Sequence, residues 1–274
     1  MSSEQKPLAL LVKIHPRSAE KREKVINLSP KTCTDQSHRE LIHPAATTQI
    51  ISSLPVNFFR QPDTQCTTWS YFTPATRQGG MLAKFQQDAP VPLIGGLEIY
   101  SSPSALSYVQ KSAEYKQYFD QVKDQDLYEK DETLEVWYPA GGFVARPNET
   151  ETGKAKIVVL ASFVAKDGPE NKDKLVEVLS NYCAWVRDNE PTTLSYGVFT
   201  RPKSPNEVLL FERYKDLPAI GAHGKTKEFK AMFKGTGPYV QGKKTVLSEW
   251  EELDGSFVSN VPGGAGAAGG KSKL

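Results

Sequence analysis

An internal repeat constrains the fold of this chain more than any other feature of its sequence. The pentapeptide TTWSY at residues 67–71 is matched by TTLSY at residues 192–196, and EIY at residues 98–100 is matched by ERY at residues 212–214. Two further matches follow in the same order, EYK at 114–116 with EFK at 228–230 and Trp137 with Trp250. Matches in one order at nearly constant spacing indicate two diverged copies of one supersecondary unit.

Each copy has the hydrophobic pattern of a β-α-β-β-α-β unit, which is clearer in the second half. The predicted strands there cover residues 156–165, 193–200, 207–214 and 245–252, and the predicted helices cover residues 169–188 and 219–233. The first half fits the same order, with strands at residues 8–14, near Cys66, near Leu97 and at residues 133–138, and with helices at residues 102–122 and somewhere within residues 36–54. This order predicts an α+β fold made of two ferredoxin-like units in tandem.

The predicted domain boundaries follow the repeat. Residues 1–150 form a first, more diverged α+β domain, residues 151–259 form the second, and residues 260–274 form a flexible Gly/Ala tail. The tail ends in Ser272-Lys273-Leu274. A terminal Ser-Lys-Leu is an import signal, so we expect peroxisomal localisation and the peroxisomal import receptor as a partner.

Composition and spacing argue against several kinds of partner and site. The net charge of the 274-residue chain is only +2, and its basic and acidic residues are interspersed, so we expect no nucleic-acid partner. No apolar run approaches the roughly 18 residues that span a bilayer, so we expect no membrane partner. Cys33, Cys66 and Cys183 are far apart and form no CxxC pair, which favours reduced thiols. His38 and His43 are a poor helical ligand pair without an acidic partner motif, so we expect no metal site.

Residue alternation along the third strand of each copy gives a candidate cavity wall. Glu212 and Tyr214 share one face of their strand, and Glu98 and Tyr100 share the corresponding face in the first half. We expect these four side chains to point into a cavity and the opposite, more apolar face to pack beneath helices. The alternative is that each glutamate lies at a polar rim, bonded to a neighbouring tyrosine or backbone group.

His223 distinguishes the two copies. It lies on the second predicted helix of the second copy, and the constant spacing places Val109 at the equivalent position of the first copy. This asymmetry predicts one complete site, in the second half. A neutral imidazole near pH 7 accepts a proton from a phenol or an enol. The alternative is a histidine that only packs or caps the helix.

Several features of the second half occur together: an apolar first strand, Glu190-Pro191 after the first helix, Tyr196 on the second strand, Glu212-x-Tyr214 on the third, and HGKTKEF at residues 223–229. With these features the second half, from about Lys156 to Leu253, resembles the antibiotic biosynthesis monooxygenase family. Members of this family are dimeric α+β barrels in which two subunits face their sheets together. The tandem copy implies that one chain builds this barrel by itself, because a covalent link makes the association intramolecular. Pairing of two such chains into a homodimer stays open.

The resemblance implies a reaction as well as a fold. Family oxygenases oxidise a small electron-rich aromatic or enolisable, polyketide-like compound with O2, and they need neither flavin nor metal. Burial would raise the pKa of Glu212 towards neutrality, so that Glu212 or His223 serves as the base. Tyr196 and Tyr214 would donate hydrogen bonds to the substrate anion.

The substrate-binding candidates follow from the same resemblance. Trp250 would form an aromatic wall of the cavity. Leu210 and Tyr214 stand where some family oxygenases carry Asn and Trp, and Glu98 and Tyr100 are the first-half candidates.

Two other functions fit the same barrel. One is the binding and degradation of haem, with His223 as the iron ligand. The other is a non-catalytic binding or structural protein whose cavity is filled by side chains such as Trp69, Trp137, Tyr196 and Trp250.

Overall fold

The computed structural model describes residues 6–28, 58–59, 61–77, 92–146, 155–201 and 203–260 of the chain. The helix predicted within residues 36–54, the C-terminal tail, Cys33, His38 and His43 lie outside the described residues. No helix within the described ranges is long and apolar enough to cross a bilayer.

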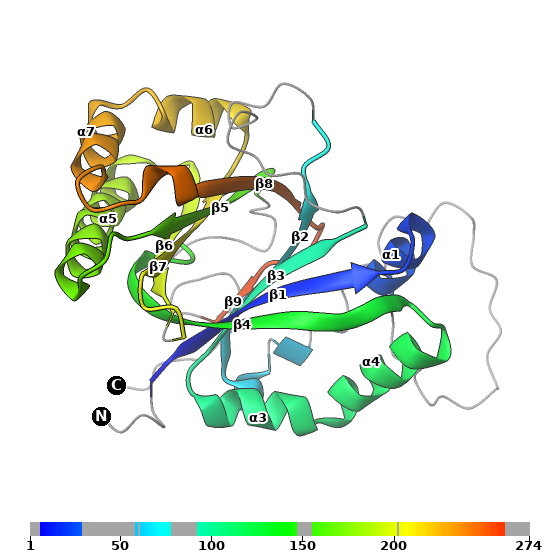
Figure 1. Cartoon of the computed structure of the whole chain (residues 1–274). Coiled ribbons are helices and arrows are strands. Elements are labelled where there is room, and N and C mark those ends of the chain that lie inside the picture. Colours follow the sequence, from blue (N-terminus) through cyan, green and yellow to red (C-terminus); the bar gives the residue numbers. More distant parts are fainter. Residues whose placement is uncertain are drawn as a thin grey trace, which may run out of the picture.

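Both halves have the predicted order of elements (Figure 1). The first half consists of β1 (Leu8–Pro16), α1 (Ala19–Ile26), β2 (Cys66–Pro74), β3 (Ile94–Tyr100), α3 (Pro103–Lys111), α4 (Ala113–Asp124) and β4 (Tyr128–Phe143). The second half consists of β5 (Ile157–Val164), α5 (Pro169–Asn189), β6 (Thr193–Thr200), β7 (Glu207–Tyr214), α6 (Leu217–His223), α7 (Lys227–Thr236) and β8 (Val246–Glu252), followed by the short strand β9 (Val258–Ser259).

The two halves close into one antiparallel barrel. The strand order is β2-β3-β1-β4 in the first half and β6-β7-β5-β8 in the second. The long strand β4 pairs with β6, and β8 pairs with β2, so that eight strands form a closed ring. β9 continues beside β2 beyond β8. The predicted α+β fold, two ferredoxin-like units joined as an intramolecular barrel, is therefore confirmed.

Each long helix predicted after the third strand is broken in two. The predicted helix at residues 102–122 ends at Lys111 and restarts at Ala113, and that at residues 219–233 is interrupted after His223. At the first break Ser112 leaves helical geometry, with φ −64° and ψ 158°, and its side chain accepts a hydrogen bond from the backbone N–H of Tyr115. Thr226 caps α7 in the same way. These side chains satisfy N–H groups that a new helix start would otherwise leave unpaired.

The strand registers correct one of the sequence matches. Trp69 lies opposite Glu98 in the first half, and Tyr196 lies opposite Glu212 in the second. Trp69, not Tyr71, therefore holds the position equivalent to Tyr196, and the TTWSY/TTLSY match is two residues out of register. The match between Trp137 and Trp250 is in register, because these residues pair with equivalent positions of β1 and β5.

Three apolar clusters fill the molecule, one inside the barrel and one between each half-sheet and its helices. The barrel interior holds side chains of both halves, including Phe72, Leu97, Trp137, Val158, Phe211 and Trp250. The helices lie outside the barrel, with α5–α7 over the second half and α3 and α4 over the first (Figure 1). The expectation that the apolar face of the third strands packs beneath helices is wrong, because Leu97 and Phe211 face the barrel interior.

The helical cover differs between the halves. α5 has 21 residues, and it buries Leu175, Leu179, Tyr182, Cys183 and Val186 against the second sheet. Its counterpart α1 has eight residues and buries only Val25. Within the described residues, α1 therefore covers less of its sheet than α5 does.

Candidate functional site

The four predicted catalytic side chains lie together on the helix-covered face of the second half. Tyr214 Oη donates to Glu212 Oε2 at 2.6 Å, and Tyr196 Oη lies 3.4 Å from His223 Nε2. The other imidazole nitrogen, Nδ1, lies 2.7 Å from Glu190 Oε2 and donates to that carboxylate. The structure thus brings the four side chains together, and it adds Glu190, which the sequence indicated only as part of the family pattern.

Burial controls the charge of this second-half cluster. Glu212 is only 7% exposed, and the loss of solvent raises the pKa of its carboxyl to about 7. The nearby His223 and the hydrogen bond from Tyr214 favour the carboxylate and limit the rise in pKa. A carboxyl with a pKa near neutrality is suited to proton transfer.

Aromatic rings surround the imidazole of His223. Its centroid lies 5.0–5.7 Å from the ring centroids of Phe229, Tyr196, Tyr214 and Tyr182. Tyr182 lies on α5, whose described counterpart in the first half, α1, has only eight residues. This surrounding does not fit a haem ligand, because Nδ1 is hydrogen bonded to Glu190, Nε2 lies 3.4 Å from Tyr196 Oη, and His223 is only 3% exposed.

The two second-half candidates for substrate contact lie on opposite faces of the sheet. Leu210 is buried in the same cluster as Tyr196 and Tyr214. Trp250 lies inside the barrel, where its ring is 5.2 Å from that of Phe72 and its Nε1 donates to Ser248. The structure therefore does not bring Trp250 together with Glu212.

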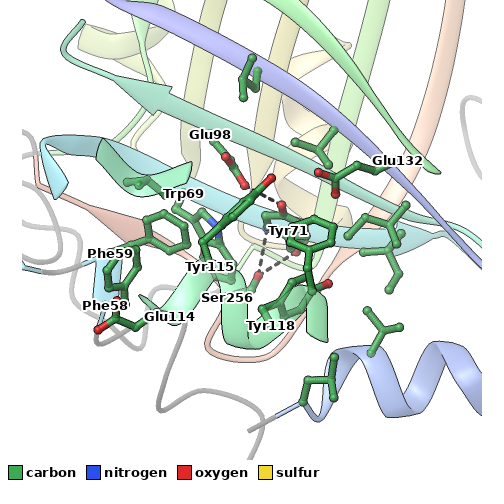
Figure 2. Close-up of a pocket in the computed structure, with 18 of the residues that line it drawn as sticks. Phe58, Phe59, Trp69, Tyr71, Glu98, Glu114, Tyr115, Tyr118, Glu132 and Ser256 are labelled. Carbon is green, nitrogen blue, oxygen red and sulfur yellow. Dashed lines mark hydrogen bonds between the residues drawn. The ribbon is translucent and has the colours of Figure 1, made fainter. Parts of the chain in front are cut away.

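A cavity of about 180 Å³ lies in the first half, between the sheet and α1, α3 and α4 (Figure 2). Its walls are mainly apolar and aromatic, and they include Phe58, Phe59, Trp69, Val109, Tyr115 and Phe119. An apolar cavity of about 150 Å³ is large enough to hold a benzene molecule. The size and lining of this cavity are thus suited to a small aromatic compound.

Glu98, a predicted substrate-binding residue, lines this cavity and is held by two phenols. Tyr71 Oη donates to its Oε1 at 2.6 Å, and Tyr100 Oη donates to its Oε2 at 2.7 Å. Burial raises the pKa of Glu98, while these hydrogen bonds oppose the rise. Gly96 permits this arrangement, because a Cβ there would lie 2.7 Å from the Tyr71 ring.

A second carboxyl, Glu132 on β4, faces the same space (Figure 2). Burial raises its pKa to about 7, and the nearby carboxyls of Glu98 and Asp131 add to the rise. The sequence prediction missed Glu132 because it placed the start of this strand at residue 133, whereas β4 begins at Tyr128. Side chains alternate between the two faces of a strand, so counting back from Trp137 would have placed Glu132 on the face opposite Trp137. This required a predicted strand that began before residue 133.

A few side chains explain why the first half contains a cavity where the second half is filled. Val109 stands where the second half has His223, and Tyr115 stands where it has Phe229. Val109 and Tyr115 both line the cavity. The smaller side chain on α3 and the short α1 leave space in the first half that His223 and Tyr182 fill in the second.

Comparison with known proteins gives a family match for the second half. Residues 157–235 match the family model described as antibiotic biosynthesis monooxygenase. No curated protein sequence matches the chain.

Solved structures share the fold over the whole chain. One is a protein from Lactobacillus acidophilus NCFM provisionally assigned as a monooxygenase, with 12% identity, a TM-score of 0.64, and coverage of 93% of this chain and 96% of that one. Another, from Fusobacterium nucleatum subsp. nucleatum and provisionally assigned in the same way, has 16% identity, a TM-score of 0.61, and coverage of 95% and 96%. A Caulobacter crescentus protein provisionally assigned to antibiotic biosynthesis monooxygenases has 29% identity over 37% of this chain and 91% of its own, with a TM-score of 0.32. The second half thus matches the antibiotic biosynthesis monooxygenase family at residues 157–235, and the fold of the whole chain is that of solved structures provisionally assigned as monooxygenases.

Proposed function

We propose that this chain is a cofactor-independent monooxygenase that oxidises a small electron-rich aromatic compound with O2, and that the substrate lies in the first-half cavity. The observation that carries the proposal is an aromatic-walled cavity lined by two carboxyls, the buried Glu98 and the partly buried Glu132. The pKa of Glu132, about 7, suits a general base at neutral pH. The match of residues 157–235 to the antibiotic biosynthesis monooxygenase family supports the reaction class.

The reaction needs no external reductant. A base takes the proton of a phenolic or enolic hydroxyl, and the electron-rich anion transfers an electron to O2. For a phenol oxidised to a quinone, the substrate loses four electrons, one oxygen atom becomes the new carbonyl, and the other leaves as water with the two hydrogens released. The protein binds and orients the ring, holds the transferred proton and limits access of water.

The second-half cluster is an alternative position for the same chemistry. Glu212, whose pKa is also about 7, would be the base, and His223 with Glu190 would accept the proton in turn. Tyr196 and Tyr214 would then hold the substrate anion. We favour the first half because the side chains of the second-half cluster pack directly against one another.

The proposed location of the reaction is the peroxisome. It rests on the terminal tripeptide Ser272-Lys273-Leu274, which an import receptor would bind.

Oxygen consumption tests the proposal. Purified full-length protein, stripped of metals, is given a panel of phenols, hydroquinones and anthrones while O2 uptake is recorded. We expect uptake without added cofactor, reduced at least tenfold in Glu132→Gln and in Glu98→Gln, and nearly unchanged in Glu212→Gln and His223→Ala. Loss of uptake only in the last two variants would place the site in the second half. Uptake no faster than the uncatalysed rate would refute the enzyme and favour a binding protein.

A further inference from the structure

The two carboxylates that face the first-half cavity, Glu98 and Glu132, differ in their hydrogen bonding. Both carboxylate oxygens of Glu98 already accept from tyrosine hydroxyls. Within the described part of the chain, the Glu132 carboxylate has no hydrogen-bond or ion-pair partner. In Figure 2 it is directed into the cavity. Glu132 is partly buried, and an acceptor that faces an apolar cavity without a partner favours a ligand that brings a donor.

The charges around the cavity are of one sign. Three glutamates line it, Glu98, Glu114 and Glu132, and no Lys, Arg or His is found among its described lining residues. A carboxylate ligand would meet like charges in a poorly solvated space, without a compensating cation. An uncharged ligand avoids this cost.

The rings of the cavity favour an aromatic body for this ligand. Phe59 and Trp69 are stacked, with centroids 5.3 Å apart, and Tyr71 follows at 4.6 Å from Trp69. A phenol combines such a body with one hydroxyl donor, and a hydroxyl that donates to a carboxylate makes a short, charge-assisted hydrogen bond.

We propose that the first-half cavity selects uncharged phenols, whose hydroxyl donates to the Glu132 carboxylate, and that it rejects aromatic carboxylates. This proposal rests on the proposed function only where it concerns the substrate that is oxidised, because ligand binding can be measured without any oxygenase activity. Residue spacing from the in-register pair Trp137 and Trp250 places Thr245 at the position of Glu132 in the second half. The proposed specificity thus belongs to the first half alone.

Several titratable groups act on Glu132 and would influence the pH dependence of binding. They are Asp131 and Tyr128 on its own strand, Glu98 on β3, Tyr71 on β2, and Tyr115 and Tyr118 on α4, and Glu114 on α4 lines the same cavity. The pKa values of these tyrosines are raised by burial, so they stay neutral around pH 7. Phenol affinity should therefore rise as Glu132 ionises near pH 7 and fall again as the ligand itself ionises near about pH 10.

Calorimetric titration with three matched ligands tests the proposal. The ligands are 4-ethylphenol, its methyl ether 4-ethylanisole, and 4-ethylbenzoate, each titrated into the full-length protein between pH 5 and pH 9. We expect the phenol to bind about 10- to 100-fold more tightly than the ether, the value of one hydrogen bond to a charged group. We expect no measurable binding of the benzoate.

Two variants identify the acceptor. Glu132→Gln should remove most of the preference for phenol over ether and the increase in affinity near pH 7. Glu129→Gln, an exposed change on the same strand, should retain both. Equal affinity for phenol and ether in the wild type, binding of the benzoate, or an unchanged preference in Glu132→Gln would each overturn the proposal.

The two proposals fail in different ways. If the phenol binds through Glu132 but no O2 is consumed, the specificity holds and the oxygenase proposal fails. If O2 is consumed at the wild-type rate by Glu132→Gln, the oxygenase stands and the role of Glu132 is wrong.

Discussion

Glu212 offers a sharp test of the electrostatics of the second-half cluster. Its carboxyl is 7% exposed, and burial raises its pKa from an ordinary 4.5 to about 7. The folded protein therefore binds this proton more tightly than the unfolded chain does, and the ionisation destabilises the fold as pH rises from about 4.5 to about 7. At about 1.4 kcal/mol per pKa unit, ionisation of Glu212 lowers the free energy of unfolding by about 3 kcal/mol in total. This loss is complete above pH 7 and absent below pH 4.5.

Glu212→Gln removes this ionisation. The free energy of unfolding of the variant minus that of the wild type should therefore increase by about 3 kcal/mol between pH 4 and pH 8.5. In thermal melts the same change should appear as a relative gain of about 6–12 °C for a chain of this size. Urea unfolding at four pH values across this range, followed by circular dichroism, measures it. Because Gln keeps an oxygen acceptor for Tyr214, the low-pH difference between variant and wild type should be small.

A matched control separates this effect from a general loss of charge. Glu177 lies on α5, where its exposed side chain pairs with Lys174. Glu177→Gln should change stability little at any of the four pH values, because exposed ion pairs contribute little. A stability difference for Glu212→Gln that does not vary with pH would refute the reasoning, since Glu212 would then ionise as easily in the folded protein as in the unfolded chain.

Three further predictions concern the barrel, the cavity and the tail. Arg213 and Glu252 form a fully buried ion pair, with Nε 2.6 Å from Oε1, so Arg213→Met and Glu252→Met should each cost about 3–5 kcal/mol in urea unfolding, and the double variant should cost clearly less than their sum; simple additivity would contradict this. Val109→Phe should fill the cavity and reduce both phenol binding and O2 uptake at least tenfold while the protein stays folded by circular dichroism; unchanged binding would place the ligand elsewhere. Deletion of residues 272–274 should turn the punctate peroxisomal signal of an N-terminal fluorescent fusion diffuse, and a punctate signal that persists would argue against the tripeptide as the import signal.

The sequence pattern predicted the bounds of the strands better than it predicted the helices or the register between the two copies of the repeat. β6 and β7 have the predicted bounds, because alternating apolar residues and a Pro-containing turn define both ends. The breaks at Ser112 and before Thr226 were missed, since both segments keep helical periodicity and only the capping hydrogen bonds interrupt them. The register of TTWSY was wrong by two residues, and strand parity could not reveal this, because a shift of two leaves every side chain on the same face.

The candidate site was predictable as a set of residues but not as a space. Parity placed Glu212 with Tyr214 and Glu98 with Tyr100, and both pairs are hydrogen bonded as the polar-rim alternative expected. Whether a group of side chains encloses a cavity depends on volumes supplied by other elements. Tyr182 on α5 closes the second half, and no repeat match indicated that the described helix α1 would be too short to carry a counterpart.

Joining two copies in one chain allows them to differ in a way that a symmetric homodimer does not allow. In a homodimer, a substitution that opens a cavity or buries a carboxyl acts in both subunits, so its cost in stability is doubled. Here the cavity and Glu132 occur in one half, and the other half fills the equivalent space with aromatic side chains. The two halves share the barrel interior, where Phe72 of the first half contacts Phe211 and Trp250 of the second. Because neither sheet can close the barrel alone, the closely packed half stabilises the half that carries the cavity, and this division leaves the first copy free to specialise in binding.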